Sequence, residues 1–344
     1  MQVEYIWIDG NEETPCLRSK TKELFNPSIA VPTLKDIPEW SFDGGSTGQG
    51  DLEDSDTLLR PCRIYPDPLI KGGFLVLCEV FNSNGTAHSS NYRHQLRHTE
   101  NLVPLDANPW FGFEQEYTLL GLTGVPIAFE GKHPAPQGPY YCGVGSNKVL
   151  RRDIAMEHLQ ACKDAGIPLY GVNAEVMPGQ WEFQTQAESP LKASDDLWMA
   201  RYILDRLSEN QKVIISYDPK PKEGWNGAGC HTNFSTSKMR DSKTGLEEIK
   251  EVIELLSKEH TEHLEVYGDG IGRRLTGKCE TSSLEKFTWG IADRGASIRI
   301  PYKVHNQGYG YLEDRRPNAN IDPYRVTNIM LKTAFLSPVL SYNS

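Results

Sequence analysis

The chain has 344 residues, enough for one large domain or two smaller ones that each bury a core. Its 36 basic and 46 acidic residues give a net charge of −10 with no Lys/Arg-rich block, which disfavours a nucleic-acid surface. The longest apolar run, Phe74–Cys78, is far shorter than the ~20 residues that span a bilayer, so we expect no membrane segment.

The N-terminal sequence MQVEYIWIDG lacks the charged-then-apolar order of a signal peptide. Seven cysteines with scattered spacing and no CxxC pair fit reduced thiols rather than a disulfide framework. Together these features predict a cytoplasmic protein.

The first 90 residues resemble a run of short strands joined by turn-rich connections. We expect strands at Val3–Ile8, near Ile29–Val31 and at Phe74–Phe81. The stretch Phe42–Asp56 between them has the Gly, Ser and Asp content of an exposed, mobile loop. Sequence physics alone makes Asp43 and Ser46 residues of a plain turn.

Helices begin to alternate with strands around Tyr92–Glu100, so we expect a second domain from residue 91 onward. Apolar residues at steps of three and four predict amphipathic helices there. They are expected at Arg152–Ala165, Pro190–Glu209, Leu246–Leu264 and from Asp322-Pro323, where an aspartate caps a first-turn proline. Their apolar stripes are core.

Two stretches of the second region combine aromatic residues with paired carboxylates. In Trp110–Tyr117, Glu114 and Glu116 are two residues apart, so on a strand they share a face with Cα atoms about 6.5–7 Å apart. That spacing gives each of two neighbouring divalent ions one carboxylate, whereas without a cation the two acids repel each other.

The second such stretch is Asn173–Gln184, NAEVMPGQWEFQ. Glu175 and Glu182 lie among apolar residues, where a carboxylate is costly to bury unless a positive charge meets it. Pro178-Gly179 predicts a turn that brings both acids toward one centre. The alternative is a hairpin edge with solvated acids.

Three further stretches supply an imidazole and arginines. His231 follows a Gly-rich loop in Gly224–Ser235, and Glu313 precedes two arginines in Tyr311–Pro317. In Asp293–Pro301 we expect a strand on which Ser297 and Arg299 share a face, which suits an anionic ligand.

These residue types indicate phosphoryl transfer, which needs metal ions and arginines to neutralise charge on the transferred group. The carboxylates and the imidazole can hold two or three Mg²⁺ or Mn²⁺ ions. The arginines available for phosphate and carboxylate groups are Arg274, Arg294, Arg299, Arg315 and Arg316. Neither a P-loop nor a GxGxxG motif is present. The residues therefore predict a metal-dependent enzyme that uses ATP.

Seven segments, in order, resemble the signature segments of glutamine synthetase of the shorter, eukaryotic-type class. They are DGGSTGQ from Asp43, FEQEY, GPYYCGVG, NAEVMPGQWEFQ, NGAGCHTNFS, RGASIRIP and YLEDRRPNAN. The resemblance runs from about Tyr5 to the C-terminus. The helical lead usual in the family is missing, since the first strand begins at Val3, and Cys279 stands where a histidine is common.

The resemblance implies an α+β fold. A small N-terminal β-grasp-like domain, residues 1–90, would precede a larger catalytic domain, residues 91–344, whose curved antiparallel sheet is flanked by helices. It also implies a homo-oligomer of pentameric rings paired as a decamer, with active sites between neighbouring subunits.

Site residues follow from the same resemblance. One metal would be held by Glu116, Glu175 and Glu182, and the second by Glu114, His231 and Glu313. Glutamate would contact Asn226, Gly227, His231, Arg274 and Arg315. ATP would contact Trp110, Asn233, Ser235, Arg240, Arg294, Arg299 and Tyr311. The ammonium site would comprise Asp43, Ser46 and Glu280, and the catalytic residues would be Asp43, Glu280 and Arg299.

The implied reaction is the ATP-dependent ligation of ammonia to L-glutamate through γ-glutamyl phosphate. Asp43 would take a proton from ammonium, and a loop carrying Glu280 would close the site. Three alternatives stay open: a related carboxylate–amine ligase, a non-catalytic structural relative, and a regulatory binding module.

Overall fold

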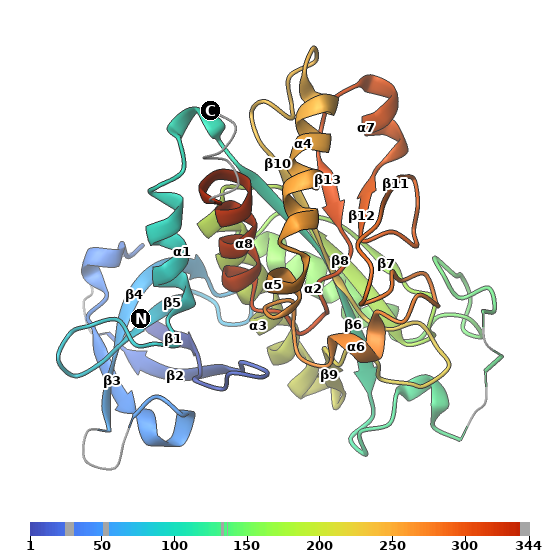
Figure 1. The fold of residues 1–344 in the computed structure, drawn as a ribbon. Helices are drawn as coiled ribbons and strands as arrows, with labels where there is room; N and C mark the ends of the chain where they lie inside the picture. Colours follow the sequence, from blue (N-terminus) through green and yellow to red (C-terminus); the bar gives the residue numbers. More distant parts are fainter. Residues whose placement is uncertain (25–30, 51–54, 132–133, 136, 338–344) are drawn as a thin grey trace.

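The computed structural model describes residues 1–24, 31–50, 55–131, 134–135 and 137–337. Its strands form two sheets, one of five strands and one of eight, with helices between and around them (Figure 1). The expected α+β class is confirmed. Within the described residues, no helix has the length and apolar character needed to cross a bilayer.

The five-stranded sheet is built by the first 81 residues in the order β2-β1-β5-β4-β3. Its strands are β1 Gln2–Ile8, β2 Leu17–Glu23, β3 Trp40–Asp43, β4 Asp56–Pro66 and β5 Phe74–Phe81. The central strands β1 and β5 pair in parallel, and every other pair is antiparallel. The strands expected at Val3–Ile8 and Phe74–Phe81 are therefore confirmed.

One other expectation for this region needs correction, and a second is not tested. The stretch Phe42–Asp56 is not one exposed loop, because its ends belong to β3 and β4. Within it Gln49 is buried, and its side-chain amide donates to the Ile8 carbonyl and to Ser90 Oγ. Residues 51–54 lie outside the described residues, as does most of the strand expected near Ile29–Val31.

The two faces of the five-stranded sheet pack against different parts of the chain. One face forms a small core of its own, which includes Tyr5, Trp7 and Val76. The opposite face, with Ile6 and Leu77, joins the main hydrophobic core of the molecule. The alternation of side chains along β1 and β5 thus divides the apolar residues between two cores.

The eight-stranded sheet has the order β11-β12-β13-β10-β6-β8-β7, with β9 pairing to β6. Its strands are β6 Trp110–Leu120, β7 Leu169–Ala174, β8 Gln180–Thr185, β9 Ile214–Ser216, β10 Cys230–Ser235, β11 Trp289–Ile291, β12 Ile298–Ile300 and β13 Leu312–Asp314. All pairs are antiparallel except β11 with β12. The sheet therefore brings strands from residues 110 to 314 side by side.

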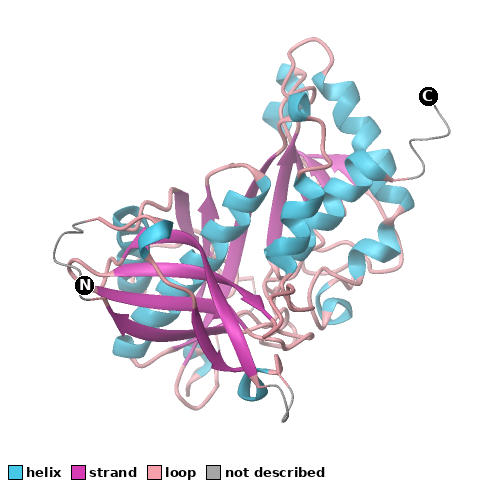
Figure 2. Ribbon diagram, turned by 90° about the vertical axis from the view of Figure 1, so that its left-hand side faces the viewer, coloured by secondary structure: helices cyan, strands magenta, loops and turns pink. Residues whose placement is uncertain are grey.

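The helices are α1 Tyr92–Glu100, α2 Arg152–Asp164, α3 Pro190–Gln211, α4 Gly245–Lys258, α5 His260–Leu264, α6 Ile271–Arg274, α7 Tyr302–Gln307 and α8 Pro323–Leu331. The longest, α3, packs on strands β6 and β8 and also contacts α1 and α8. Tyr65 in β4 donates to Asp196 in α3, so this helix also touches the five-stranded sheet. Figure 2 shows helices lying between the strands of the two sheets.

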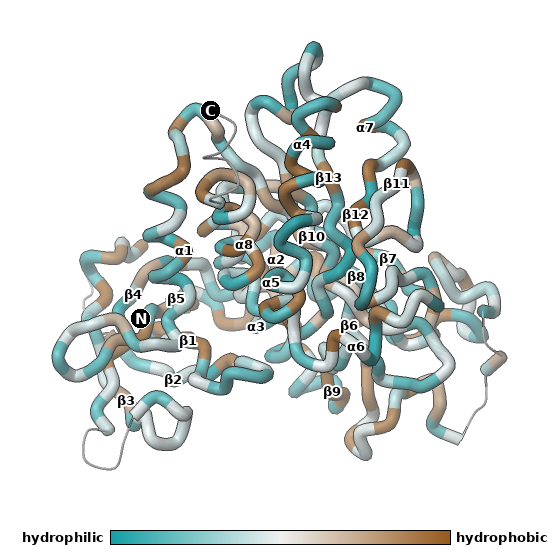
Figure 3. The backbone as a smooth tube through the Cα atoms, viewed as in Figure 1, coloured by the Kyte–Doolittle hydropathy of each residue, from teal (hydrophilic) through white to brown (hydrophobic). Residues whose placement is uncertain are grey.

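The expected helices are confirmed with one exception. The helix expected over Leu246–Leu264 is divided at Glu259 into α4 and α5. Along α4, hydrophobic residues recur between hydrophilic ones at helical spacing, as expected (Figure 3). Asp322 caps α8 by accepting a hydrogen bond from the Tyr324 backbone N–H. The strand expected over Asp293–Pro301 is confined to the three residues of β12.

Candidate active site

Neighbouring strands of the eight-stranded sheet present a shared polar face. Cross-strand pairing places Glu114 of β6 opposite His231 of β10, and Glu116 of β6 opposite Glu182 of β8. On the other side of β10, Arg299 of β12 lies opposite Glu313 of β13. Directly opposed residues point to the same side of a sheet, so the register itself gathers these groups.

The gathered side chains line a cavity with a volume of about 230 Å³. Its lining comprises Glu114, Glu116, Tyr141, Glu175, Glu182, Asn226, Gly227, His231, Arg274, Cys279, Glu280, Thr281, Arg294, Arg299 and Arg315. Five of the six predicted metal ligands belong to this lining. The sixth, Glu313, is 2 % exposed and lies beside His231.

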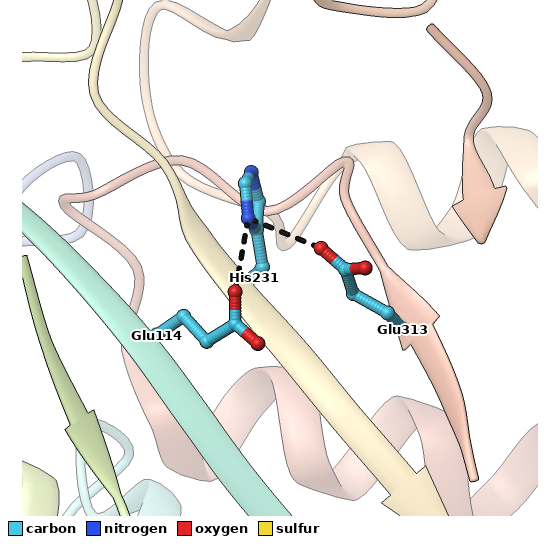
Figure 4. A group of neighbouring side chains, drawn as sticks. All are labelled: Glu114, His231 and Glu313. Atoms are coloured by element: carbon cyan, nitrogen blue, oxygen red, sulfur yellow. Dashed lines mark ion pairs between the residues drawn. The ribbon is translucent and has the colours of Figure 1, made fainter. Parts of the chain in front are cut away.

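Two groups of three side chains have the geometry to hold a cation. Glu114, His231 and Glu313 form one, and Glu116, Glu182 and His231 form the other; within each group the ligand atoms lie within 4.8 Å of one another. His231 Nδ1 is 3.5 Å from Glu114 Oε2 and 3.4 Å from Glu313 Oε1 (Figure 4). The first group matches the predicted second metal site. The other contains two of the three ligands predicted for the first site.

The carboxylates on the β6–β8 side are destabilised in their ionised form. Burial raises the pKa of Glu175 to about 8, with a further contribution from the charge of Glu116. Burial and the neighbouring Glu175 also raise the pKa of Glu182 well above its usual range. Burial raises the pKa of Glu116, although Arg274 opposes it. Oxygen ligands crowded in this way suit a hard divalent cation, whose charge offsets their repulsion.

The remaining member of the predicted first site, Glu175, is oriented by two donors. Asn173 Nδ2 donates to Glu175 Oε1 at 2.8 Å, and the backbone N–H of Val176 donates to Oε2 at 3.2 Å. Glu175 follows β7, whereas Glu182 is in β8, so the turn at Pro178-Gly179 joins them as the sequence predicts. The hairpin is confirmed, but both acids are buried rather than solvated.

Arginines surround the opposite side of the cavity. Arg315 Nη1 donates to Glu313 Oε1 at 2.6 Å, and Arg299 Nη1 donates to Glu313 Oε2 at 3.1 Å. Arg294 forms a 3.1 Å ion pair with Glu280, which lies in the loop after α6. Arginine guanidinium groups in this arrangement can receive phosphate or carboxylate oxygens.

Arg274 is buried and lines the cavity. Its Nη2 lies 3.1 Å from His231 Nε2, and its guanidinium also donates to the backbone carbonyls of residues 315–317. Burial lowers the Arg274 pKa to about 10. Burial, followed by the positive charge of Arg315, lowers the pKa of His231 well below its usual range. The imidazole is therefore neutral at physiological pH, as a metal ligand must be.

A second cavity of about 770 Å³ adjoins the first and shares Glu114, Tyr141 and Glu182 with it. The Arg240 guanidinium lies 3.9 Å from the centre of the Trp110 ring and donates to Ser235 Oγ at 2.7 Å. The predicted ATP residues in its lining are Trp110, Asn233, Ser235, Arg240 and Tyr311. A volume of this size is typical of small-molecule sites.

Three of the residues predicted to bind ligands, Asp43, Ser46 and Arg316, lie apart from these cavities. Asp43 and Ser46 are exposed at the edge of the five-stranded sheet, where Asp43 Oδ1 accepts from the Gly45 N–H. Neither belongs to the cavity linings described above. Arg316, expected among the anion-binding arginines, is fully buried and paired with Asp314 at 2.6 Å. The expectation for Arg316 is wrong, because its guanidinium is occupied by Asp314 and His260 in the protein interior.

Some lining residues were missed by the sequence reasoning. Tyr141 belongs to both linings, and its ring lies 5.7 Å from the Arg294 guanidinium. Asn173 and Gln184 line the larger cavity beside the glutamates. A signal for Gln184 existed, since it is two residues from Glu182 in β8 and so shares its strand face.

Comparisons with known proteins agree with this geometry. The family model described as glutamine synthetase, catalytic domain, matches residues 91–262. Glutamine synthetase of Suillus bovinus is 50% identical over 342 residues, which cover 98% of this chain and 94% of that protein. The chain belongs to the glutamine synthetase family. A family member from Gallus gallus is also 50% identical, over 98% of this chain and 90% of that protein.

Two further comparisons extend the range of relatives. Glutamine synthetase 1, mitochondrial, of Drosophila melanogaster is 47% identical over 98% of this chain and 84% of that protein. The solved structure of Plasmodium falciparum glutamine synthetase has a TM-score of 0.76 and 17% identity, covering 97% of this chain and 71% of that chain. The structure of apo GmaS has a TM-score of 0.75 and 20% identity, covering 96% of this chain and 77% of that chain. These two structures share the fold.

Proposed function

We propose that this site joins ammonia to L-glutamate at the expense of ATP, and that the residues gathered in the two cavities perform the reaction. The chain is a glutamate–ammonia ligase by its family membership. The observation that carries the assignment of residues is the wall shared by the two cavities. There Glu114 and Glu182 separate an arginine-rich space from a larger one with an exposed tryptophan.

The residues fit divalent metal ions of the Mg²⁺ or Mn²⁺ kind. Glu116, Glu175 and Glu182 would hold one ion, and Glu114, His231 and Glu313 a second. Their mostly buried carboxylate oxygens and a neutral imidazole are a donor set that these ions accept. When bound, such ions neutralise charge on the phosphate oxygens of ATP.

The first step is transfer of the γ-phosphoryl group. ATP occupies the 770 Å³ cavity with its base near Trp110 and its phosphates directed toward Arg294 and Arg299. Arg274 and Arg315 bind the carboxylate end of glutamate at the base of the smaller cavity. An oxygen of the γ-carboxylate attacks the γ-phosphorus, the bond to the β-phosphate oxygen breaks, and γ-glutamyl phosphate and ADP result.

The second step is formation of the amide. Asp43 and Glu280 attract ammonium, and Asp43 takes one of its protons. The ammonia nitrogen attacks the acyl carbon and the bond to the phosphate oxygen breaks. The nitrogen loses a second proton to the departing phosphate, so glutamine and hydrogen phosphate leave. Glu280 stands at the mouth of the cavity beside Arg294, a position from which its loop can exclude water from the intermediate.

The protein assembles, by this proposal, as pentameric rings paired as a decamer. Asp43 is exposed on the five-stranded sheet, away from the lining of its own subunit's cavity, so it is available to a neighbour. A head-to-tail contact that closes by rotation gives a ring in which each site is completed by the next subunit. We retain residues 1–90 and 91–344 as the two functional units.

The cytoplasm is the proposed location of the enzyme. The seven cysteines are free thiols, which fits a reducing compartment. Fractionation of the source cells, followed by detection of the chain, tests this location against an organelle.

The activity is tested by incubating purified protein with ATP, glutamate, ammonium and Mg²⁺ and measuring phosphate and glutamine. Omitting glutamate should abolish phosphate release, and omitting ammonium should abolish glutamine. Replacing ammonium with methylamine distinguishes a ligase for another amine. Faster product formation with methylamine would contradict the proposed substrate.

The shared site is tested by mixing two inactive variants. Asp43→Asn impairs only the part contributed by the small unit, and Glu182→Gln only the part contributed by the large unit. If they are unfolded together and reassembled, about a quarter of head-to-tail interfaces combine two intact parts, so about a quarter of wild-type activity returns. Each variant taken alone through the same cycle is the control. Mixed oligomers that stay inactive would place the whole site within one chain.

A further inference from the structure

A chain of two amide side chains connects the glutamates on the β7–β8 hairpin. Gln184 Nε2 donates to a carboxylate oxygen of Glu182 and to Asn173 Oδ1, the latter at 2.5 Å. Asn173 Nδ2 in turn donates to Glu175 Oε1 at 2.8 Å. The two carboxylates are thus joined through an unbroken series of hydrogen bonds, which we call the amide relay.

The chemistry of the four groups fixes the direction of every bond in the relay. With a metal ion bound, the two glutamates are ionised and only accept hydrogen bonds, so both ends of the relay must then receive a donor. Asn173 uses its amino group on Glu175, which leaves its oxygen to face Gln184. Gln184 must then present its amino group to both neighbours, because its two hydrogens meet two acceptors. Turning either amide over would oppose an oxygen to an oxygen.

Strand register holds the relay in place. Asn173 of β7 pairs with Glu182 of β8, and Gly171 pairs with Gln184, next to an irregularity in the ladder between Leu169 and Gly171. A Cβ atom at position 171 would lie only 2.8 Å from Gln184 Oε1. The missing side chain of Gly171 therefore leaves the space in which the Gln184 amide takes this orientation.

We propose that Asn173 and Gln184 are positioning residues that set the distance and orientation of Glu175 and Glu182 for one divalent ion. This inference rests on the proposed function, in which the two glutamates are metal ligands. Amides orient a carboxylate without adding positive charge, whereas a lysine or arginine in the same place would compete with the ion. Partners of this kind around metal ligands commonly contribute 10- to 100-fold to metal affinity.

The test measures Mn²⁺ binding to the purified, metal-free full-length protein by electron paramagnetic resonance, without substrates. Gln184→Met keeps the length of the side chain but removes both donors, and Asn173→Leu does the same for the other amide. Gly171→Ala leaves both amides intact but crowds Gln184. Gln186→Met is the matched control, since Gln186 is exposed and lies two residues further along the chain.

We expect the wild type and Gln186→Met to bind at least two Mn²⁺ ions per subunit with the same affinities. In Gln184→Met and Asn173→Leu, one ion should bind about 10- to 100-fold more weakly and the other unchanged, with Gly171→Ala showing a smaller loss at the same ion. The thermal unfolding midpoint of the metal-free protein should stay near the wild-type value, which separates positioning from a loss of fold.

Two results would overturn the relay while leaving the proposed function intact. In one, the relay variants bind both ions as tightly as the wild type. In the other, both ions are weakened equally and the unfolding midpoint drops, which indicates general damage to the hairpin. If the wild type itself bound no Mn²⁺, the proposed function and the relay would both be wrong.

Discussion

The two sides of the catalytic cavity treat their carboxylates in different ways. On the β7–β8 side, Glu175 and Glu182 receive hydrogen bonds from neutral amides. On the β12–β13 side, Glu313 is paired with Arg315 at 2.6 Å and with Arg299 at 3.1 Å. The acids of the first side are therefore met by neutral donors, whereas on the second side two guanidinium groups face one carboxylate.

This difference explains how one cavity can serve both a cation and anions. The amide side favours a cation, because its acids destabilise one another when ionised. The arginine side keeps guanidinium groups beside the same space, where phosphate and carboxylate oxygens can reach them. A cavity with uniform charge would attract the metal or the substrates, but not both.

The largest expected effect comes from removing an acid on the amide side. Glu182→Gln keeps the size of the side chain, and the loss of one ligand should lower turnover by more than about 100-fold, beyond the range typical of outer partners. The fold should remain intact by circular dichroism. Near-normal turnover at limiting Mg²⁺ would show that Glu182 is not a ligand.

The next effect concerns stability and pH. The pKa of Glu175 is raised from 4.5 to about 8 in the folded protein. Its contribution to the free energy of unfolding is therefore fully present below pH 4.5 and is lost as the pH rises through 8. Glu175→Gln should therefore stabilise the metal-free protein at pH 7 by on the order of 3 kcal/mol. Thermal unfolding in EDTA at pH 7 and pH 8 measures this.

The pH range of this effect distinguishes Glu175 from a buried histidine. Burial lowers the His158 pKa to about 4, so this group changes stability mainly between pH 4 and 6.5.

A metal control tests the same prediction. Saturating Mg²⁺ should remove the difference in stability between wild type and Glu175→Gln or reverse its sign. A metal-free variant less stable than wild type would contradict the assigned direction of the pKa shift.

A smaller effect is expected at the loop on the arginine side. Glu280→Ala removes the partner of Arg294 and opens the mouth of the cavity. Glutamate-dependent ATP hydrolysis should continue, while glutamine formed per ATP falls up to about tenfold as water reaches the intermediate. The ratio of glutamine to phosphate is the readout. A ratio equal to the wild-type value would exclude a closing role for this loop.

The smallest expected effect is on metal affinity at the arginine side, and it tests directly how the two sides of the cavity differ. Arg299→Met removes a positive charge from beside Glu313. The ion that we propose for Glu114, His231 and Glu313 should therefore bind several-fold more tightly, because Coulomb repulsion between it and the guanidinium is lost. Turnover should fall, because the variant lacks the guanidinium that we propose to face the phosphates of ATP. Calorimetric titration with Mn²⁺ measures the affinity. Unchanged or weaker binding would mean that Arg299 does not compete with the ion.

Much of the eight-stranded sheet was predictable because its signals are local. Glu114 and Glu116 lie two apart in an aromatic strand, and that spacing alone placed both on one face. The cross-strand partners of these residues were not predictable from spacing, since the register of β6 with β8 and β10 depends on pairing between distant segments. The resemblance to a known family indicated which of these residues act together at each metal ion.

The five-stranded sheet was predicted less well for a physical reason. β2, with the sequence LRSKTKE, is a polar edge strand whose pattern does not alternate between apolar and polar residues. β4 contains Pro61 next to a shift in register, which breaks the usual strand pattern. Both strands form because β1 and β5 offer them a partner, so their structure is decided by the rest of the sheet.

Arg316 and the break in the helix at Glu259 share another cause. Arg316 donates to His260 Nδ1 and to Asp314, and these contacts bring together the start of α5 and β13, which lie about fifty residues apart in the chain. No local pattern contains such a contact. The sequence shows that an arginine is present, but its burial depends on packing against the start of α5, which is distant in the chain.

The shared core of the five-stranded sheet and α3 has a consequence for synthesis of the chain. The last strand of this sheet ends at Phe81, but Glu4 and Tyr65 find buried partners on α3, which begins 109 residues later at Pro190. At translation rates of about 5–20 residues per second, the apolar face with Ile6 and Leu77 stays uncovered on the ribosome for roughly 5 to 20 seconds. The nascent N-terminal segment therefore exposes this apolar face until α3 emerges.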